Sequence, residues 1–511
     1  MIETFDSLLA GFQVALRPDV LWYAFLGCLV GTLVGMLPGI GPLGGISILL
    51  PLTFGLDATK AIVMLAGIYY GSQYGGSTTS ILLRIPGEAS SVMTCIDGNA
   101  MAKKGRAGAA LCIAAVGSFV AGTFGVVVLT LVAPPLAEFA LRFGPPEYTA
   151  LLLLGLIFLA YMSTTSLVRT LLMASFGVLL GTVGIDVMTG HFRYSFNIAE
   201  LGDGLGIVPV AVGLFGLAEI LSAPSRRVSG QVMRPRLREL WPSREEWRGA
   251  APAIARGSVL GFLVGIIPGS AHIISSFMSY ALERRVSRRP EEFGRGAVAG
   301  VAGPESANNA ASTGSFVPLL ALGIPTGPVT AVLIAALLIH GVPPGPTLVN
   351  DHPNVFWGFV ASMYVGNLML LALNLPLVGV FVNLLRIPYA YLYPMIIMFC
   401  VIGVYEVNNS IVDVWIMLAM AVIGYGLKKF GLDPAPLVLG LVIAPILEMS
   451  LRQSLIMSDH GWLIFLQRPI AAVLLAVSVV LLAAAAYGGF SRRRDWRARL
   501  VETETTQREG T

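Results

Sequence analysis

Charge is scarce in this chain of 511 residues. Only 12% of the residues are charged, with 33 Lys and Arg against 29 Asp and Glu, and the formal net charge is +4. An ordinary soluble domain carries roughly 25% charged residues, so a soluble enzyme with a solvated surface is excluded. The hydrophobic share of 55% excludes a disordered chain. A small net charge confined to loops gives no reason to expect nucleic-acid binding.

Reactive side chains are also few. The chain has four Cys and five His, with no CxxC and no HExxH spacing. The cysteines are interpreted as small buried hydrophobic residues, and no metal centre, cofactor or catalytic residue is expected. A membrane-embedded enzyme would need a paired nucleophile and base or a metal set, which these residues do not supply. No P-loop motif occurs, so we do not expect ATP hydrolysis. Residues 1–17 lack the pattern of a cleavable signal peptide.

What the sequence does have is a series of long apolar segments. A helix needs about 20 apolar residues to cross a bilayer, and the abundant Gly and Pro are tolerated in membrane helices. Several segments are too short or too interrupted to be simple spans. The pattern therefore predicts an all-α polytopic membrane protein with about 10–12 transmembrane helices plus re-entrant or broken helices.

The positive charges indicate which loops face the cytoplasm. Lys and Arg are concentrated in five short stretches, and by the positive-inside rule these stretches are cytoplasmic. The loops 134–147 and 341–356 carry almost no positive excess and are expected outside. The basic stretches are 103–106, 222–256, 284–295, 428–429 and 492–499.

An internal repeat divides the chain into two halves. Residues 27–39 (GCLVGTLVGMLPG) and 257–269 (GSVLGFLVGIIPG) are identical at seven of 13 positions, and 69–87 resembles 301–327 when gaps are allowed. Loops that follow the matched motifs carry opposite charge signals, which predicts repeats of inverted topology. The expected organisation is an N-terminal segment 1–20, a first repeat 21–221, a basic linker 222–256, a second repeat 257–465, a helix 466–490 and a tail 491–511.

Each repeat begins with a predicted re-entrant hairpin. Both flanks of 257–283 are basic, and this length suits two legs that meet at mid-membrane, with Pro268, Gly269 and Ser270 at the tip. Symmetry places a second tip at 38–41, which includes Pro38, Gly39 and Gly41. The alternative is a single transmembrane helix bent at a proline.

Polar runs inside apolar surroundings are the candidate sites. Irregular or polar backbone at membrane depth survives only where it is buried in protein or lines a cavity, and broken helix ends attract carboxylates and Na⁺. The alternative is hydrogen bonding between helices, or an ordinary loop at the two Ile-Pro breaks. The candidate substrate-binding residues are Ser77, Thr78, Thr79, Gly87, Ser90, Ser91, Asn308, Asn309, Ser312, Thr313, Thr326 and Gly327.

A second set of residues is predicted to bind the coupling cation. It consists of Pro38, Gly39, Gly41, Pro268, Gly269, Ser270, Glu305 and Ser306. Glu305 is the strongest candidate for a cation or proton site; the alternative is a structural pair with an Arg. Arg84 is interpreted either as a bidentate partner for an anionic substrate or as a side chain that reaches the cytoplasmic interface. Glu88 and Asp97 are expected simply to face the basic residues 103–106.

Three long motifs resemble one known family. GMLPGIGPLGG, GIYYGSQYGGSTTSILLRIPGEASSVMTCIDGNAMAKKGRAG and GPESANNAASTGSFVPLLALGIPTGP are similar to the large permease subunit of tripartite tricarboxylate transporters, and the similarity extends from about residue 20 to residue 465. The resemblance implies a multi-pass protein of the bacterial inner membrane that works with a periplasmic binding protein and a small membrane subunit. It also implies uptake of citrate or another carboxylate driven by Na⁺ or H⁺, and an elevator-type fold.

The expected mechanism is alternating access, with a carboxylate and one or more cations bound between the two polar motifs. One rival is a cation-coupled organic-anion symporter that works without a binding protein. Another is a channel, which would need a continuous pore lined by charges or carbonyls. Two inverted broken-helix motifs favour a transporter over a channel.

Overall fold

The computed structural model describes residues 2–37, 40–162, 166–222, 240–269, 271–375 and 389–490. In these ranges the protein is almost entirely helical. The described strands are β1 (Gly184–Ile185) and β2 (Phe192–Arg193), which form one short antiparallel pair. The predicted all-α polytopic membrane class is confirmed.

The first half contains the helices that carry the first polar run. In chain order they are α1 (Ile2–Ala15), α2 (Pro18–Met36), α3 (Gly41–Leu49), η1 (Leu50–Thr53), α4 (Ala58–Leu83), η2 (Ala89–Ser91), α5 (Val92–Met101), η3 (Ala102–Arg106), α6 (Ala107–Ala140), α7 (Pro145–Met162), α8 (Leu167–Leu180), η4 (Ala199–Asp203), α9 (Ile207–Ala211), η5 (Val212–Leu217) and α10 (Ala218–Ser222).

The second half repeats much of this order. Its helices are α11 (Arg244–Gly265), α12 (Ala271–Val286), η7 (Pro290–Glu292), α13 (Ala299–Gly314), α14 (Phe316–Leu322), α15 (Pro328–Ile339), α16 (Leu348–Asp351), α17 (Pro353–Asn374), α19 (Tyr389–Asn408), α20 (Ile411–Lys429), α21 (Ala435–Ile456), η8 (Gly461–Leu463), α22 (Ile464–Gln467) and α23 (Pro469–Phe490).

Helices that could span a membrane are fewer than the predicted crossings. Among the described residues, five helical segments are long and apolar enough to span, or six if the bent pair Gly461–Gln467 and Pro469–Ala485 counts as one span. Six further apolar helices are only 10–17 residues long. The figure of about 10–12 crossings therefore requires short or broken helices, and it stays a prediction.

A glycine stripe joins the first hairpin helix of each half to the polar helix that follows. A Cβ added at Gly35 of α2 would lie 2.1 Å from the carbonyl oxygen of Ser72 in α4. A Cβ added at Gly265 of α11 would lie 2.4 Å from the carbonyl oxygen of Ala311 in α13. Glycine at every fourth position thus lets two helix backbones approach closely, as the repeated sequence pattern suggested.

The two halves also exchange helices. α6 of the first half packs on α11 and α13 of the second, while α17 of the second half packs on α2 and α4 of the first. Similarly α8 packs on α21, and α20 packs on α9, η5 and α10. Neither half therefore forms a separate body, and the polar helices α4 and α13 come together in the interior.

The helix breaks after α4 and α14 share one backbone geometry. Arg84 (φ 57°) and Gly323 (φ 69°) both adopt the left-handed conformation, and Ile-Pro follows each of them. Glu88 and Gly327 then occupy the N-cap positions of the next helical segments, and the hydroxyls of Ser91 and Thr330 bond back to the N-cap N–H groups. The structure thus relates the two breaks at a constant offset of 239 residues, with no gap.

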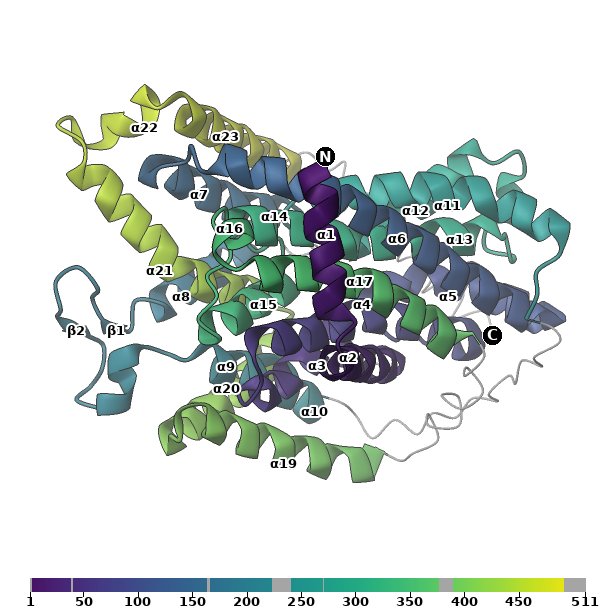
Figure 1. The fold of residues 1–511 in the computed structure, drawn as a ribbon, viewed down its shortest axis with the longest axis horizontal. Helices are drawn as coiled ribbons and strands as arrows, with labels where there is room; N and C mark the ends of the chain where they lie inside the picture. The colour runs from purple at the N-terminus through teal and green to yellow at the C-terminus, as the bar shows by residue number, and fades with distance from the viewer. Residues whose placement is uncertain are drawn as a thin grey trace.

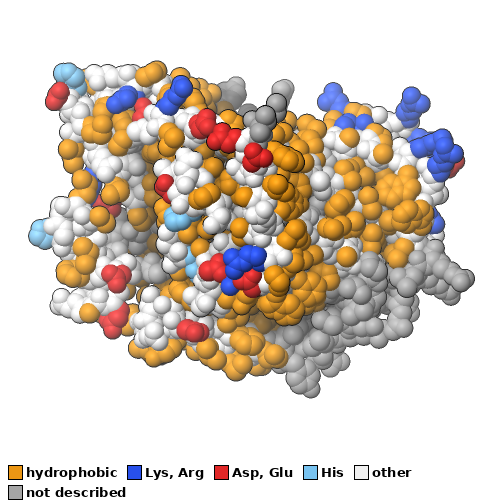
Figure 2. Space-filling model, in the orientation of Figure 1, with side chains coloured by type: hydrophobic (Ala, Val, Ile, Leu, Met, Phe, Trp, Pro, Cys, Tyr) orange, Lys and Arg blue, Asp and Glu red, His pale blue; other side chains and the backbone are white. Residues whose placement is uncertain are grey.

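Figure 1 shows α11, α12 and α13 side by side with α5 and α6 at the right of the molecule, while α7, α8, α21 and α23 gather at the left. Hydrophobic side chains cover much of the visible face in Figure 2, and Lys and Arg side chains lie in small groups at its upper right, its upper left and near its centre. This distribution suits a protein whose flank contacts lipid.

Candidate functional site

Glu305 lies at the contact between the two polar helices. It sits on α13, and only 1% of the residue is exposed. Ser77 of α4 donates a hydrogen bond to its Oε2 at 2.6 Å, and Thr94 of α5 donates to its Oε1. A carboxylate that accepts a hydroxyl at each oxygen is well solvated by the protein. Glu305 therefore joins the second half to both segments that flank the first break.

A second buried carboxylate, Glu88, lies at the first break itself. Its Oε1 accepts hydrogen bonds from Asn308 Nδ2 at 3.2 Å and from Ser90 Oγ. Asn308 follows Glu305 by three residues on α13, so the two side chains lie on the same face of the helix. We call Gln73, Ser77, Glu88, Ser90, Thr94, Glu305 and Asn308 the carboxylate cluster.

The second hairpin closes over the first break. Ser276 of α12 donates to the carbonyl oxygen of Ser90 at 2.7 Å. Behind it, the Ser91 hydroxyl accepts from Ser80 at 2.9 Å and donates to the backbone carbonyl oxygen of Glu88, so Ser91 supports the backbone of the break and does not bond to the side-chain carboxylates of Glu88 and Glu305. The cluster is thus enclosed by α4, α5, α12 and α13, which belong to both halves.

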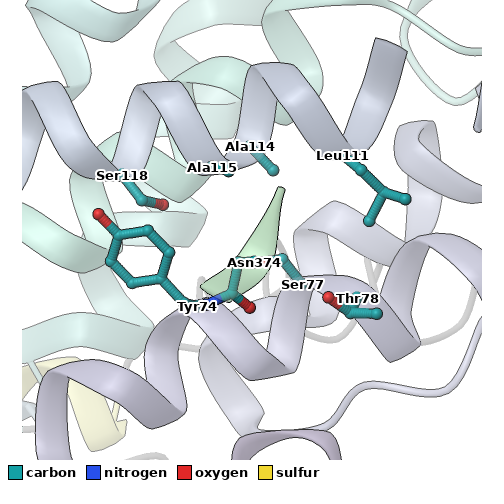
Figure 3. A pocket seen from close by; sticks show the side chains of 8 residues that line it. All are labelled: Tyr74, Ser77, Thr78, Leu111, Ala114, Ala115, Ser118 and Asn374. Atoms are coloured by element: carbon teal, nitrogen blue, oxygen red, sulfur yellow. The ribbon is translucent and has the colours of Figure 1, made fainter. Parts of the chain in front are cut away.

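A small cavity adjoins the cluster. It lies between α4 and α6, and Ser77, Thr78, Tyr74, Ser118 and Asn374 are among the side chains that surround it (Figure 3). Its volume of about 10 Å³ is enough for roughly one water molecule. A carboxylate substrate would need the helices around it to separate, which is the kind of movement that alternating access supplies.

Several predicted substrate residues bond within α13 or reach α6. Asn309 donates to Ser118 Oγ at 2.7 Å and to the carbonyl oxygen of Glu305. The Ser312 and Thr313 hydroxyls bond to carbonyls one turn back on α13, at 3.1 Å each. Thr79 bonds back to Gly76 in the same way. These contacts match the structural alternative for the polar runs.

The other predicted residues lie at the helix breaks. A Cβ at Gly87 would lie 2.0 Å from the Gly35 carbonyl oxygen, so only glycine fits there. Gly269 donates its N–H to the Thr326 carbonyl oxygen at 2.6 Å, and Gly327 lies against Gly269. The end of the first hairpin helix therefore contacts the first break, and the turn of the second hairpin contacts the second break.

Three further predicted cation residues, Gly41, Pro268 and Ser306, form none of the hydrogen bonds of the carboxylate cluster. Gly41 begins α3 with a φ of 61°. Pro268 is half-buried in the turn between α11 and α12. The buried Ser306 hydroxyl faces α6 at Gly117. Pro38, Gly39 and Ser270 lie outside the described residues.

The interpretation of Glu88 and Asp97 as surface partners of residues 103–106 is wrong. Asp97 is fully buried and accepts N–H groups from Gly294, Gly296 and Ala297 as well as the Tyr280 hydroxyl. Asp97 lies in the short helix α5, and one buried carboxylate there leaves no hydrophobic periodicity, so sequence alone did not reveal its burial. The position of Glu88 one residue after Ile-Pro-Gly was the available signal.

Two further members of the cluster, Gln73 and Thr94, were missed as site residues. Gln73 lies in the first polar run but was not selected, and Thr94 lies in the short helix α5 after the break, outside both polar runs. Arg84, considered as a substrate partner, is exposed in the structure. No Lys or Arg in the described part of the chain forms an ion pair with Glu88 or Glu305.

A larger cavity of about 650 Å³ lies near β1 and the C-terminal part of α21. Its charged side chains are already paired: Arg452 contacts Asp186 at 2.7 Å and Glu448 at 2.8 Å, and Arg193 contacts Glu448 at 2.6 Å. Hydrogen bonds from Arg452 hold the pKa of Asp186 well below its usual range. The arginines at this cavity are thus already neutralised by the protein's own carboxylates.

Two proteins of Agrobacterium vitis are similar in sequence to this chain. A protein from Agrobacterium vitis described as "Uncharacterized 52.8 kDa protein in TAR-I ttuC' 3'region" is 47% identical over 495 residues, which cover 97% of this chain and 99% of that protein. A second, described as "Uncharacterized protein in TAR-II ttuC' 3'region", is 46% identical over 235 residues, which cover 46% of this chain and 97% of that protein. No solved structure matches.

The family comparison gives the most direct result. The model of the tripartite tricarboxylate transporter TctA family matches residues 21–439, a range that includes both polar helices and both breaks. This points to the large subunit of a transporter and not to an enzyme. The chain therefore belongs to the tripartite tricarboxylate transporter TctA family.

Proposed function

We propose that this chain is the large membrane subunit of a secondary transporter that imports citrate or another di- or tricarboxylate, driven by a Na⁺ or H⁺ gradient. A periplasmic binding protein delivers the substrate, and a small membrane subunit completes the complex in the inner membrane of a bacterium. The observation that carries the proposal is the carboxylate cluster, where both halves meet through Glu305 and no Lys or Arg among the described residues pairs with it.

The absence of a basic partner matters for coupling. An ionised carboxylate buried at membrane depth is costly, and it marks an ion or proton pathway in many membrane proteins. A bound cation or proton would neutralise Glu305 and let a dianionic or trianionic substrate approach. Hydroxyl and amide donors of the cluster, such as Ser77 and Asn308, would then meet the substrate oxygens.

The exchange of helices between the halves supports alternating access of the elevator type. The hairpins, α4, α5 and α13 would move together and carry the site across the membrane, while helices outside this group would form the scaffold. Movement of this unit would open the cluster, where the adjacent cavity now has room for about one water molecule.

The proposal is tested by uptake of labelled citrate and other carboxylates into proteoliposomes under an imposed Na⁺ or H⁺ gradient. Parallel samples omit the small subunit or the binding protein. Uptake that needs all three components and a cation gradient supports the proposal. Uptake by this chain alone would favour the symporter that works without a binding protein. Gradient-independent flux far faster than a carrier cycle would favour a channel and contradict both.

A further inference from the structure

We propose that Glu88 forms a Na⁺ site of its own, distinct from the site predicted at Glu305, with oxygen ligands from both halves of the chain. The inference deepens the proposed function and rests on it for the role of the bound ion in transport. The binding itself can be measured without any transport.

The first observation is an open oxygen on a buried carboxylate. Glu88 is only 7% exposed, and its Oε1 is bonded to Asn308 and Ser90. Its Oε2 is buried with no hydrogen-bond partner in the described structure. Glu305 differs, because a hydroxyl reaches each of its oxygens. An unsatisfied carboxylate oxygen in a buried position is costly unless something occupies the space beside it.

The second observation is a matching open oxygen on Asn308. A carboxylate can only accept, so Asn308 turns its Nδ2 toward Glu88 Oε1 at 3.2 Å. Its Oδ1 is also buried and has no partner in the described structure. Because the two side chains already touch through their other atoms, both open oxygens belong to one small region between α13 and the first break.

Gln73 supplies a third oxygen. Ser90 Oγ lies 3.2 Å from the Gln73 amide and also bonds to Glu88, yet a hydroxyl has only one hydrogen to donate. Ser90 gives that hydrogen to the carboxylate, the stronger acceptor. Turning the Gln73 amide over then lets its NH₂ donate to Ser90 and removes the unpartnered Nε2. The Gln73 oxygen is thereby left open.

The chemical nature of these oxygen ligands indicates which ion they would bind. Carboxylate, amide carbonyl and hydroxyl oxygens bind hard cations, and no nitrogen or sulfur ligand takes part. A single carboxylate balances one positive charge, which favours a monovalent ion. In the described part of the chain, no group of three or more His, Cys, Asp or Glu could hold a metal ion. Na⁺ satisfies both the oxygen set and the charge.

The arrangement ties ion binding to the contact between the halves. Glu88, Ser90 and Gln73 belong to the first half, and Asn308 belongs to the second. The corresponding break of the second half has Gly327 at the N-cap position of Glu88, so the inferred carboxylate site has no counterpart there. An ion at Glu88 would hold α13 against the first break and leave the amides and hydroxyls ordered for the substrate.

The test is equilibrium binding of ²²Na⁺ to the purified full-length chain in detergent, with choline chloride to hold ionic strength constant. We compare the wild type with Glu88→Gln, which keeps the acceptor for Asn308 and Ser90 but removes the charge. The second variant is Asn308→Leu, which removes the ligand oxygen at similar volume. The matched control is Glu147→Gln, because Glu147 is also buried but accepts the Gly144 N–H outside the cluster.

We expect Glu88→Gln to weaken one Na⁺ site about ten- to a hundredfold, Asn308→Leu to weaken the same site, and Glu147→Gln to bind as the wild type does. Unchanged Na⁺ binding by Glu88→Gln would overturn the assignment, as would loss of binding only in Glu305→Gln. A wild-type chain that binds no ²²Na⁺ between pH 6 and pH 9 would also overturn it. Failure of carboxylate uptake by the complete wild-type transporter would instead contradict the proposed function and leave the binding result standing.

Discussion

The two helix breaks of this transporter have the same backbone but different chemistry. Arg84 and Gly323 adopt the same left-handed conformation, and the hydroxyls of Ser91 and Thr330 support the following turn in the same way. The first break nevertheless carries a carboxylate, Glu88, where the second carries Gly327. Duplication has thus preserved the backbone framework while the ionisable groups differ between the halves.

The polar helices differ in the same manner. At the offset that superimposes the breaks, Glu305 corresponds to Ala66 and Asn308 to Tyr69, so the polar run of α13 lies nearer its start than the polar run of α4. The gapped sequence comparison matched the two polar runs with each other. The structure shows instead that they occupy different positions of the repeat. They lie next to each other because the helices meet, with Ser77 against Glu305.

The largest expected effect comes from removing the carboxylate that joins the halves. Glu305→Ala leaves the Ser77 and Thr94 hydroxyls without their acceptor and removes the buried charge. We expect carboxylate uptake to fall by about a hundredfold or more, since buried charged hydrogen bonds contribute roughly 1.5–3 kcal/mol each. Initial uptake rates in proteoliposomes measure this, with Glu147→Gln as control. Uptake above half of the wild-type rate would contradict a coupling role for Glu305.

The next largest effect is expected from substitutions in the glycine stripes. They test whether α2 and α4 in the first half, and α11 and α13 in the second, both depend on close contact between their backbones. Gly35→Ala and Gly265→Ala would each place a methyl group within 2.4 Å of a carbonyl oxygen. We expect each to destabilise the protein by about 1–3 kcal/mol. Thermal unfolding in detergent measures the change.

Gly249→Ala in α11 is the matched control for these substitutions, because nothing lies within 4 Å of the added Cβ. A helix-interior alanine there should leave the melting temperature unchanged or raise it. Equal melting temperatures for all three variants would show that the stripe does not hold the helices together.

A smaller effect should distinguish the backbone support that both breaks share from the Na⁺ binding inferred only at the first break. Ser91→Ala and Thr330→Ala each remove a hydroxyl that bonds to an N-cap N–H, at 3.4 Å and 2.8 Å. We expect each to cost about 1 kcal/mol of stability. Only Ser91→Ala, which lies beside Glu88, should also shift the Na⁺ concentration needed for half-maximal uptake. A similar shift in Thr330→Ala would erase the difference inferred between the halves.

The smallest effect concerns a contact between the halves that joins Asp186, which follows β1, to Arg452 near the C-terminal end of α21. Because the pKa of Asp186 is lowered in the folded protein, its contribution to stability is present above the unfolded value of about 4 and is lost as pH falls through the folded pKa. The melting temperature of Asp186→Asn should therefore lie below that of the wild type at pH 7. The two should converge only below about pH 4. A difference that does not shrink as the pH falls from 4 to 2 would contradict this pair as its source.

Sequence reasoning identified the helical membrane class, the glycine stripes and both breaks, because each leaves a local pattern in the chain. Hairpin tips were predicted at 38–41 and 268–270. In the structure α2 ends at Met36 and α3 begins at Gly41, while α11 ends at Gly265 and α12 begins at Ala271. The roles of individual polar residues were harder to predict. Asn308 and Asn309 are neighbours in sequence, yet one bonds to Glu88 and the other to Ser118 of α6. Which helix face meets which partner depends on packing between the halves, and one sequence does not contain that information.

Asp97 has a mechanical consequence. Its carboxylate, on α5, collects three backbone N–H groups from the stretch that leads into α13 and a hydroxyl from α12. Loss of these hydrogen bonds would leave the carboxylate, three N–H groups and a hydroxyl unsatisfied at once. The Asp97 contacts therefore hold α5, α12 and the start of α13 together as one rigid unit. A conformational change in transport should therefore move α5, α12 and the start of α13 together as one rigid unit. The hinges of that movement should lie outside the segments that Asp97 joins.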